Sequence, residues 1–453
     1  MKKDQQQTIT IIGAGLGGCF LALLFAKRGY KVNIYERSSE KEIMDTYTTA
    51  RSYNLTLYDY GLNALKEVDV WEEIKPTLVR LVGSVTQIAI NPDRLIKDKP
   101  YHAVQRATLL KILIKKAKTY PSVSFHFGKE LIGINRYEKT IVIQDIETKK
   151  LEIIICDVIF GADGVNSPVR AALQIGQQSI HIQEYADWQY KQIHFTNAMC
   201  EKLGLQPNLM YAWTRKETLI LAHPNFDNSF SALLILPKTK GENFTSLSNQ
   251  EAIESFFSHS YPSFKSVMPT VTKAMLENPV SNFVTIYTQP WYYKNFIAVI
   301  GDAAHGFNPF YGQGVSAAFA DGMTIAELVD KHGSDWQTVF AKYQEIRKKH
   351  TDALATLSKE SIAQYTRYKK ADYAAVYNKL DVILYQLFPK LFNPPPYVHI
   401  ATNPLYAGDY LEKHTRQRGK ARWIGIPIAV GLVTGLIAIQ EITSNVLRKK
   451  SEN

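Results

Sequence analysis

The residues best suited to chemistry near the start of the chain are a run of glycines followed, one strand later, by a carboxylate. Gly13, Gly15 and Gly18 fit the pattern G-x-G-x-x-G, with Leu16 inside it, and Glu36 stands 23 residues after Gly13. Glycines at this spacing let the backbone approach a diphosphate at a helix N-terminus, and the carboxylate can accept hydrogen bonds from a ribose. The pattern predicts that the chain binds an adenine dinucleotide, and it does not separate FAD from NAD.

A second stretch with a carboxylate in a turn is Asp157–Arg170, which contains Asp163 and Gly164. It has the pattern of a strand that runs into a turn and then a helix. Ser167 suits a helix N-cap and Pro168 suits the first helical position. By itself this stretch is also compatible with an ordinary capped strand-to-helix junction.

A third stretch begins at Ile300 and delivers Asp302 at the end of a short apolar run. Pro309 and the glycine turn Gly312–Gly314 follow, and a helical pattern starts at the turn. The amides of such a turn, at the N-terminus of a helix, favour negative charge on a bound group.

These three motifs, in this order, resemble the group A flavoprotein monooxygenases of the para-hydroxybenzoate hydroxylase type, and the match spans Ile9 to Asp321. The resemblance implies FAD at the first motif, Asp302 on its ribityl chain, the glycine turn at the flavin edge, and a shared FAD and NAD(P)H role for the Asp163 stretch. The cofactor-binding residues that it implies are Gly13, Gly15, Leu16, Gly18, Glu36, Arg37, Arg51, Gln105, Arg106, Asp163, Asp302, Pro309, Gly312, Gln313, Gly314 and Val315. Taken alone, Arg51 or Arg106 is a surface arginine.

The resemblance implies that NAD(P)H reduces the flavin, O2 adds at its C4a carbon, and the resulting hydroperoxide hydroxylates an electron-rich aromatic ring. This chemistry requires positioning and exclusion of water rather than a nucleophilic triad or a metal. The sequence shows no G-x-S-x-G, no H-E-x-x-H and no Cys/His cluster at zinc spacing. We assign no catalytic residue, and we expect His305, which follows Asp302, to have a structural role.

Within this family the chain is similar to the kynurenine 3-monooxygenases, first of all in the stretch Arg51–Leu65. Those enzymes hold an amino-acid carboxylate with an arginine, an asparagine and two tyrosines. The resemblance makes Arg80, Tyr101 and Tyr406 the substrate-binding candidates. The sequence departs from the pattern at the asparagine, where Lys369 or Lys370 stands, so the substrate stays open. The run Leu209–Pro224 either walls the substrate cavity or is plain sheet core.

The elements that must position these residues form a mixed α/β chain, too long at 453 residues for one typical compact domain. We expect a Rossmann-like FAD-binding domain that contains an inserted, mainly antiparallel substrate domain, followed by a helical C-terminal region. Helical patterns are predicted near Leu62–Glu67 and Ala107–Thr119. The predicted boundaries are 1–75, 102–180 and 285–335 for the FAD-binding domain, 76–101 and 181–284 for the substrate domain, 336–422 for the helical region, and 423–447 for an apolar helix.

The end of the chain is basic and then apolar. Of the net charge of +11, +9 lies in 341–453, and Trp423–Ile439 contains no charged residue. Seventeen helical residues span about 26 Å, just short of a ~30 Å hydrocarbon core. The segment is either a buried helix or a peripheral or anchored contact with the cytoplasmic face of a membrane. We expect no nucleic-acid partner, because no nucleic-acid-binding motif accompanies the charge.

The three cysteines, Cys19, Cys156 and Cys200, are too few and too widely spaced for a disulfide framework. With a polar N-terminus this predicts a cytoplasmic protein. The leading hypothesis is a kynurenine-monooxygenase-like hydroxylase that uses FAD, NAD(P)H, O2 and a small aromatic substrate. Alternatives are the same chemistry on a hydrophobic phenol, quinone precursor or polycyclic compound, a flavin-dependent isoprenoid reductase, and a flavin-binding scaffold without turnover.

Overall fold

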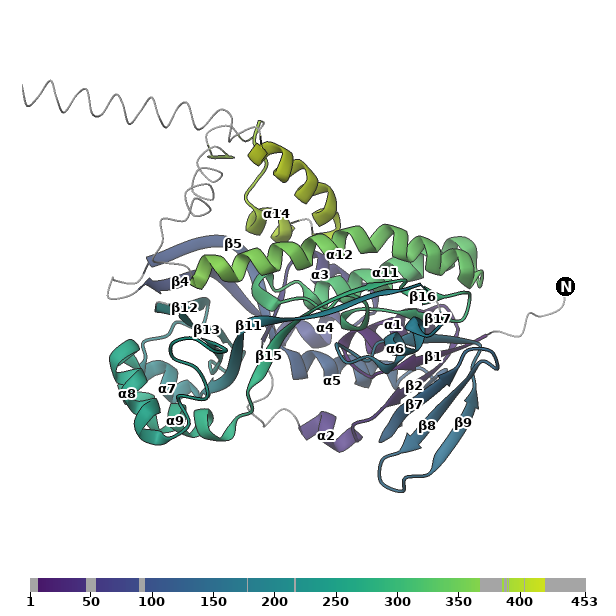
Figure 1. Cartoon of the computed structure of the whole chain (residues 1–453), viewed down its shortest axis with the longest axis horizontal. Helices are drawn as coiled ribbons and strands as arrows, with labels where there is room; N and C mark the ends of the chain where they lie inside the picture. Colours follow the sequence, from purple (N-terminus) through teal and green to yellow (C-terminus); the bar gives the residue numbers. More distant parts are fainter. Residues whose placement is uncertain are drawn as a thin grey trace, which may run out of the picture.

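Two large β-sheets, joined by long helices, make up the protein. The computed structural model describes residues 7–45, 54–88, 94–176, 178–215, 217–366, 385–386, 389, 391–402 and 404–419. Figure 1 shows one sheet with its helices on each side of the molecule and helix α12 (Trp336–Thr366) running along both. This arrangement confirms the predicted mixed α/β fold with an inserted, mainly antiparallel sheet and a helical C-terminal region.

The first sheet, which we call the cofactor sheet, begins with the predicted βαβ unit. Strand β1 (Thr8–Ile12) leads through helix α1 (Leu16–Lys27) to strand β2 (Lys31–Glu36). The strand order is β16-β17-β10-β1-β2-β6, and all neighbours are parallel except β16 and β17. The remaining strands are β6 (Val123–Phe127), β10 (Val158–Gly161), β16 (Tyr292–Tyr293) and β17 (Ile297–Val299). The chain runs outward from β1 in both directions, which is the arrangement that forms a ligand crevice at the carboxyl ends of the strands.

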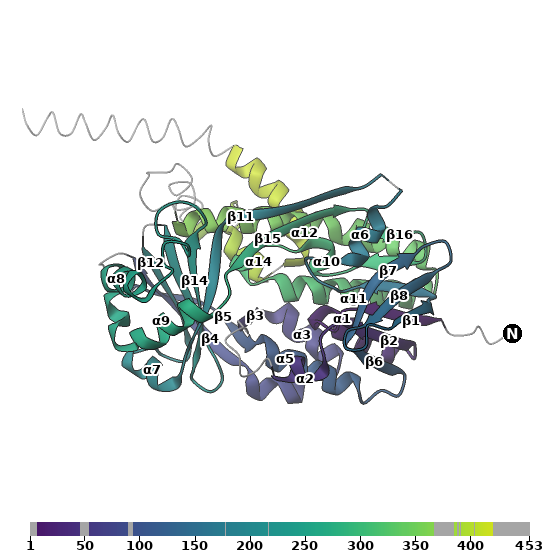
Figure 2. The same cartoon turned by 60° about the horizontal axis from the view of Figure 1, so that its bottom comes forward.

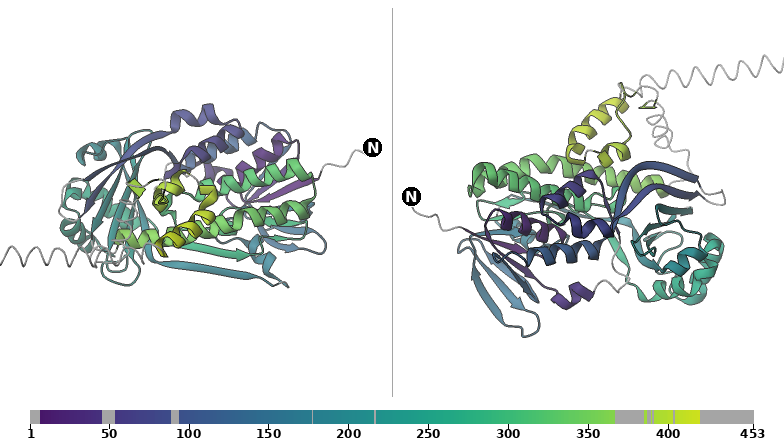
Figure 3. Two further views of the ribbon diagram at one scale, coloured as in Figure 1. Left: turned by 90° about the horizontal axis from the view of Figure 1, so that it is seen from above. Right: turned by 180° about the vertical axis from the view of Figure 1, so that it is seen from behind.

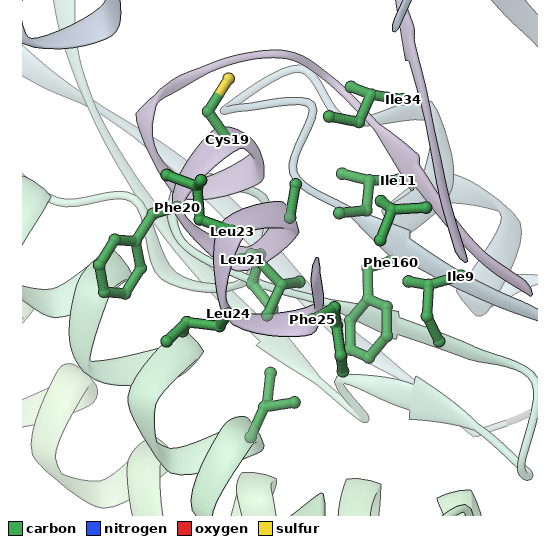
Figure 4. Close-up of a cluster of buried hydrophobic side chains, with 14 of the residues drawn as sticks. Ile9, Ile11, Cys19, Phe20, Leu21, Leu23, Leu24, Phe25, Ile34 and Phe160 are labelled. Atoms are coloured by element: carbon green, nitrogen blue, oxygen red, sulfur yellow. The ribbon is translucent and has the colours of Figure 1, made fainter. Parts of the chain in front are cut away.

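Helix α1 is apolar on nearly every side because it is enclosed on nearly every side. Leu21, Leu23 and Phe25 are completely buried, and they lie against strand residues such as Ile9 and Ile11 (Figure 4). On its far side, Phe20 stacks on Phe319 with ring centroids 4.3 Å apart. Each such side chain stabilises the fold by about 1.5–3 kcal/mol through burial alone. The helix that carries the glycine loop is therefore held rigidly.

The second sheet, the substrate sheet, has the order β15-β11-β14-β13-β12-β4-β5-β3. Its neighbours are antiparallel except β4 and β12. The strands are β3 (Asn54–Leu57), β4 (Val79–Ile88), β5 (Arg94–Gln105), β11 (Ile180–Phe195), β12 (Leu209–Arg215), β13 (Thr218–Pro224), β14 (Phe230–Pro237) and β15 (Ser281–Gln289). The sheet thus takes strands from 54–105 and 180–289, and the domain boundaries given above stay a prediction.

One face of the substrate sheet is a packed core. Its inward residues alternate along the strands, as in Tyr211 and Trp213 of β12, and they pack on helices α8 (Gln250–Ser260) and α9 (Met268–Glu277). These helices, with α7 (Asn197–Lys202), cover the outer side of the sheet (Figure 2). Because side chains alternate along a strand, the residues between these point to the opposite face.

The remaining elements surround the two sheets. Helix α3 (Asp59–Glu67) and helix α5 (Arg106–Ala117) confirm the two helical patterns predicted there. A three-stranded sheet consists of β7 (Lys129–Asn135), β8 (Thr140–Asp145) and β9 (Leu151–Ile155). Short elements are α2 (Glu40–Asp45), α4 (Trp71–Ile74), η1 (Lys75–Thr77), α6 (Pro168–Gln174), η2 (Pro262–Val267), α10 (Asp302–His305) and η3 (Pro309–Tyr311).

The C-terminal part is helical, as predicted. Helix α11 (Gly314–His332) precedes α12, and α14 (Pro396–Thr402), η4 (Pro404–Tyr406) and the helical residues 407–419 pack on them (Figure 3). The predicted apolar helix at 423–447 lies outside the described residues. Within the described part of the chain, no helix has the length and apolar character that crossing a bilayer requires.

Candidate functional site

The glycine loop after β1 is built by close backbone contacts. Gly13 has φ of +103°, and a Cβ added there would lie 2.5 Å from the carbonyl oxygen of Ala162. A Cβ on Gly18 would lie 2.1 Å from the carbonyl oxygen of Gly13. At Gly15 the same test meets nothing closer than 4.0 Å, so this position faces open space. The loop therefore presents bare backbone to the cavity at the N-terminus of α1, as a diphosphate site requires.

Glu36 braces the same loop from the end of β2. Its Oε2 accepts a hydrogen bond from the backbone N–H of Ala14 at 2.9 Å, and its Oε1 accepts one from Ser38 at 2.9 Å. Each carboxylate oxygen has a second lone pair, so both can still accept hydrogen bonds from a ribose. The neighbouring Arg37 is exposed.

The Asp163 turn has the predicted cap. Ser167 accepts a hydrogen bond from the backbone N–H of Arg170 at 2.9 Å, and Pro168 is the first residue of α6, which confirms both assignments. Asp163 Oδ2 accepts from Val169 N–H at 3.0 Å, while its Oδ1 is buried with no partner among the described residues. Burial raises the pKa of Asp163 to about 6, against hydrogen bonds that lower it. A buried oxygen without a donor is the feature expected where a ligand supplies one.

The third motif forms the opposite edge of the site. Asp302 begins α10, separated from the end of β17 by two residues, and is exposed. Gly312 has φ of +64°, and a Cβ there would lie 2.7 Å from Thr56, so β3 and this turn are in close contact. A Cβ on Gly314 would meet nothing within 4 Å. The first turn of the 19-residue helix α11 thus opens onto space, with the positive end of its dipole exposed there.

Behind this turn lies a buried ionic network centred on Asp321. Its Oδ2 is 2.6 Å from His305 Nε2 and accepts from the backbone N–H of Gly301 at 2.9 Å, and its Oδ1 accepts from Arg347 Nε at 2.9 Å. Burial alone would raise the pKa of Asp321, but His305 and Arg347 outweigh burial and lower it. The network joins α10, α11 and α12. His305 is 2% exposed within it, which supports the structural role predicted for this residue.

One cavity of about 750 Å³ connects these motifs with the open face of the substrate sheet. On the cofactor side it is bounded by the glycine loop and the two later motifs. On the substrate side it is bounded by strands β4, β12, β13 and β14 and by Phe283 and Phe310. The wall on that side includes Ser84, Thr86, Met210, Thr214, Leu221, His223, Ser231, Leu233 and Ile235.

Eight of the predicted cofactor residues line this cavity, namely Gly15, Leu16, Arg106, Asp302, Pro309, Gly312, Gly314 and Val315. Other predicted cofactor residues lie next to the cavity-lining residues without lining the cavity themselves. Gln105 is the N-cap of α5 and accepts a hydrogen bond from Thr108 Oγ1 at 3.1 Å. Gln313 is 1% exposed, and its Oε1 has no partner among the described residues. Arg51 lies outside the described residues.

The predicted substrate residues are not brought together. Tyr101 lines the cavity, next to Tyr58, with ring centroids 5.4 Å apart. Leu81 is the cross-strand partner of Tyr101, so these two side chains share a face of the sheet. Arg80 precedes Leu81 and therefore points to the opposite face, where it is exposed. Tyr406 is 58% exposed on η4, beside His350, and is not part of the cavity wall. No carboxylate clamp of Arg80, Tyr101 and Tyr406 therefore exists in this geometry.

The sequence left two interpretations of the run Leu209–Pro224 open, and it marked little else of the substrate side. Both interpretations hold: Met210, Thr214, Leu221 and His223 line the cavity, whereas the residues between them, such as Tyr211 and Trp213, belong to the packed core. Ser84, Thr86 and Ser231 were missed. The only signal that could have found them is strand alternation, which assigns a face once the opposite face is known to be core.

The residues present fit FAD. Open backbone at Gly15 and Gly314, the two carboxylates Glu36 and Asp302, and two helix N-termini that face the cavity form a site for a long dinucleotide. Two buried oxygens that have no hydrogen-bond partner among the residues described, Asp163 Oδ1 and Gln313 Oε1, lie in the same motifs. No cation or nucleophile is required of the chain to hold such a group.

Comparison with known proteins agrees with this geometry. Residues 6–358 match the family model described as FAD binding domain. The kynurenine 3-monooxygenase of Salinispora arenicola is 30% identical over 447 residues, covering 96% of this chain and 97% of the relative. That of Legionella pneumophila is 32% identical over 359 residues, covering 78% and 79%.

The chain belongs to the FAD-dependent aromatic hydroxylases.

Solved structures support the same fold for this hydroxylase. A 2-methyl-3-hydroxypyridine-5-carboxylic acid oxygenase is similar with a TM-score of 0.67 and 18% identity, covering 82% of this chain and 94% of that one. A tetracycline destructase is similar with a TM-score of 0.61 and 14% identity, covering 83% and 96%. At these identities the likeness shows the fold alone.

Proposed function

We propose that this hydroxylase uses NAD(P)H and O2 to add a hydroxyl group to a small aromatic substrate. FAD, when bound, supplies the redox chemistry that accepts electrons from NAD(P)H and activates O2. The protein binds the cofactor through the glycine loop, Glu36, Asp302 and the first turn of α11. It orients the ring against the substrate sheet and excludes water with apolar side chains such as Leu233 and Phe283.

The observation that carries this proposal is the continuity of the cavity. The same space touches Gly15 and Asp302 on the cofactor side and Leu221 and Ile235 on the substrate side. A cofactor held by the first group is adjacent to an aromatic ring held by the second. A scaffold that only bound the cofactor would have no need of the second wall.

The test is oxidation of NADH or NADPH by the FAD-loaded protein, with and without L-kynurenine, while O2 and product mass are followed together. Hydroxylation predicts that substrate stimulates both NAD(P)H and O2 consumption and that the product gains one oxygen atom. Consumption of NAD(P)H without O2 would support the reductase alternative instead. A protein that cannot take up FAD contradicts the proposal.

A second candidate keeps the chemistry and changes the substrate to an aromatic without an amino-acid carboxylate. The placement of Arg80 and Tyr406 outside the cavity favours it, since neither reaches a ring on the substrate sheet. Stimulation of O2 uptake by a neutral phenol but not by L-kynurenine would decide for it.

We also propose that residues 423–447 bring the enzyme to a cytoplasmic membrane surface, on the basis of their apolar sequence and basic flanks. The full chain should then co-sediment with anionic vesicles, and a chain that ends at residue 422 should not. Equal sedimentation of both would contradict this proposal.

A further inference from the structure

His223 is an unusual residue in the wall of the substrate cavity, because among the described residues that β4, β12, β13 and β14 contribute to this wall it alone has a side chain that can titrate. Tyr211 on β12 pairs with Ala222 on β13, so His223 lies opposite Met210. On its other side, His223 pairs with Ser231 on β14. All three line the cavity. No described residue makes a hydrogen bond to the His223 ring.

The backbone at His223 is also held by a side chain from β3, the edge strand of the same sheet. Asn54, at the start of β3, donates from Nδ2 to the carbonyl oxygen of Pro224 at 2.6 Å and lies 3.4 Å from that of His223. Asn54 also lines the cavity. Asn54 thereby attaches the end of β13 to β3, the strand that contacts the turn at Gly312. This attachment fixes the position of the His223 imidazole relative to the cofactor motifs.

The charges around the imidazole are few. Among the described residues that line the cavity, only Arg106 and Asp302 are charged, and both belong to the motifs assigned to the cofactor. The other groups that can titrate in the wall are the phenols of Tyr58, Tyr101 and Tyr311. Burial lowers the pKa of His223 to about 4, so at neutral pH the ring is uncharged and one nitrogen is a hydrogen-bond acceptor.

The hydroxyl-bearing residues of this wall complete the pattern. Ser84 is the cross-strand partner of Met210, and Ser231 that of His223, so the row across the sheet reads serine, methionine, histidine, serine. The Ser231 hydroxyl, which also hydrogen-bonds the Asn225 side chain at 3.3–3.4 Å, is the one hydroxyl directly beside His223 in this row. A phenolic hydroxyl both donates and accepts hydrogen bonds, so it can donate to the acceptor nitrogen of His223. Among the described residues of this wall a carboxylate finds no cation, so it would be desolvated without a partner.

We propose that His223 determines substrate specificity by accepting a hydrogen bond from a ring hydroxyl, and that the substrate is an uncharged phenol of one or more rings. This inference rests on the proposed function, whose substrate class it names. It makes His223 a substrate-binding residue rather than a support of the fold.

The experiment measures binding of three matched two-ring probes to the FAD-loaded full chain by the change in flavin absorbance at pH 7. The probes are 2-naphthol, naphthalene, which lacks the hydroxyl, and 2-naphthoate, which carries a carboxylate instead. We expect 2-naphthol to bind most tightly. His223→Leu should weaken 2-naphthol about tenfold, as the loss of one hydrogen bond implies, and change naphthalene less than twofold.

Two further variants separate specificity from structure. His223→Gln keeps an acceptor and should recover most of the affinity for 2-naphthol. His194→Leu replaces the exposed histidine opposite Ser231 on β11, outside the cavity, and should change no probe. Equal weakening of naphthalene and 2-naphthol by His223→Leu, tighter binding of 2-naphthoate, or no binding of 2-naphthol would overturn the inference. If any of these occurs while an aromatic compound still stimulates O2 uptake, the proposed function stands and only the phenol assignment fails.

Discussion

The cofactor side and the substrate side of the cavity are built on different principles. On the cofactor side, three short stretches of consecutive residues each complete a turn, and each turn presents backbone to the cavity. On the substrate side, single side chains from four strands form the wall, spaced two or four residues apart along a strand. The first kind of site is fixed by conformation and close approach, and the second by side-chain chemistry.

The two sides should therefore respond differently to substitution. A change in the cofactor motifs disturbs backbone geometry or a buried network and affects the whole enzyme. A change in the wall of the substrate sheet alters one contact and leaves the packed face intact. Four substitutions test this contrast, and they are given from the largest expected effect to the smallest.

Asp321→Asn should destabilise the enzyme by about 3–5 kcal/mol, because Arg347 stays buried without its counter-charge. Thermal unfolding of the FAD-loaded protein measures this as a large fall in Tm. The control is Asp330→Asn on the same helix, whose partner Arg28 forms an ion pair with 55% of the Asp330 side chain exposed. Asp330→Asn should lower the free energy of unfolding by less than about 1 kcal/mol. Equal losses for both would contradict the role given to the network.

Gly13→Ala should lower FAD affinity about 100-fold, because alanine is strained at φ of +103° and its Cβ collides with the carbonyl of Ala162. The ratio of bound FAD to protein after dialysis measures the effect. Gly128→Ala is the matched control, since Gly128 also has positive φ but its added Cβ meets nothing within 4 Å. If Gly13→Ala retained full FAD, the close approach of the loop to Ala162 would have no bearing on binding.

Asp163→Asn should raise the stability of the FAD-free protein at pH 8, by on the order of 1–3 kcal/mol. The folded-state pKa of about 6 is above that of the unfolded chain, so the folded state is favoured at low pH and loses this stability as the pH rises through 6. Denaturant unfolding of both proteins at pH 8 and pH 5 should show a gain that shrinks at pH 5. A gain independent of pH would mean that ionisation of Asp163 is not its cause.

Thr86→Val is the smallest change, an isosteric substitution in the cavity wall. It should alter stability by less than about 0.5 kcal/mol and leave FAD binding unchanged, while shifting the relative affinity for 2-naphthol and naphthalene toward naphthalene. Unfolding and probe titration on the same preparation give both numbers. A loss of FAD from this variant would break the contrast between the two sides.

How much the sequence reveals follows from the same contrast. The sequence predicts the glycine loop, Asp302 and the glycine turn Gly312–Gly314 because the residues of each motif are contiguous. Backbone geometry restricts these positions to glycine, proline or a capping side chain. The substrate wall could not, because its members come from strands whose pairing is not local. Arg80 illustrates the difficulty: a shift of one residue along β4 separates the exposed Arg80 from the completely buried Leu81.

The Asp321 network escaped prediction for a related reason. Asp321 and Arg347 lie on different helices, 26 positions apart, and nothing in either helical pattern marks them as partners. The structural role expected for His305 did not identify the carboxylate that it meets. Long-range pairs of this kind require the packing angle between helices, which residue types alone do not fix.

The strict alternation along the substrate strands has an evolutionary consequence. Strands β4, β12, β13 and β14 present tightly packed residues such as Trp213 and Leu234 on one face and cavity residues such as His223 and Leu233 on the other. Selection for a new substrate can act on one set while the other set is kept by selection for folding. A lineage with this fold can change what it oxidises through single substitutions, without passing through unstable ancestors.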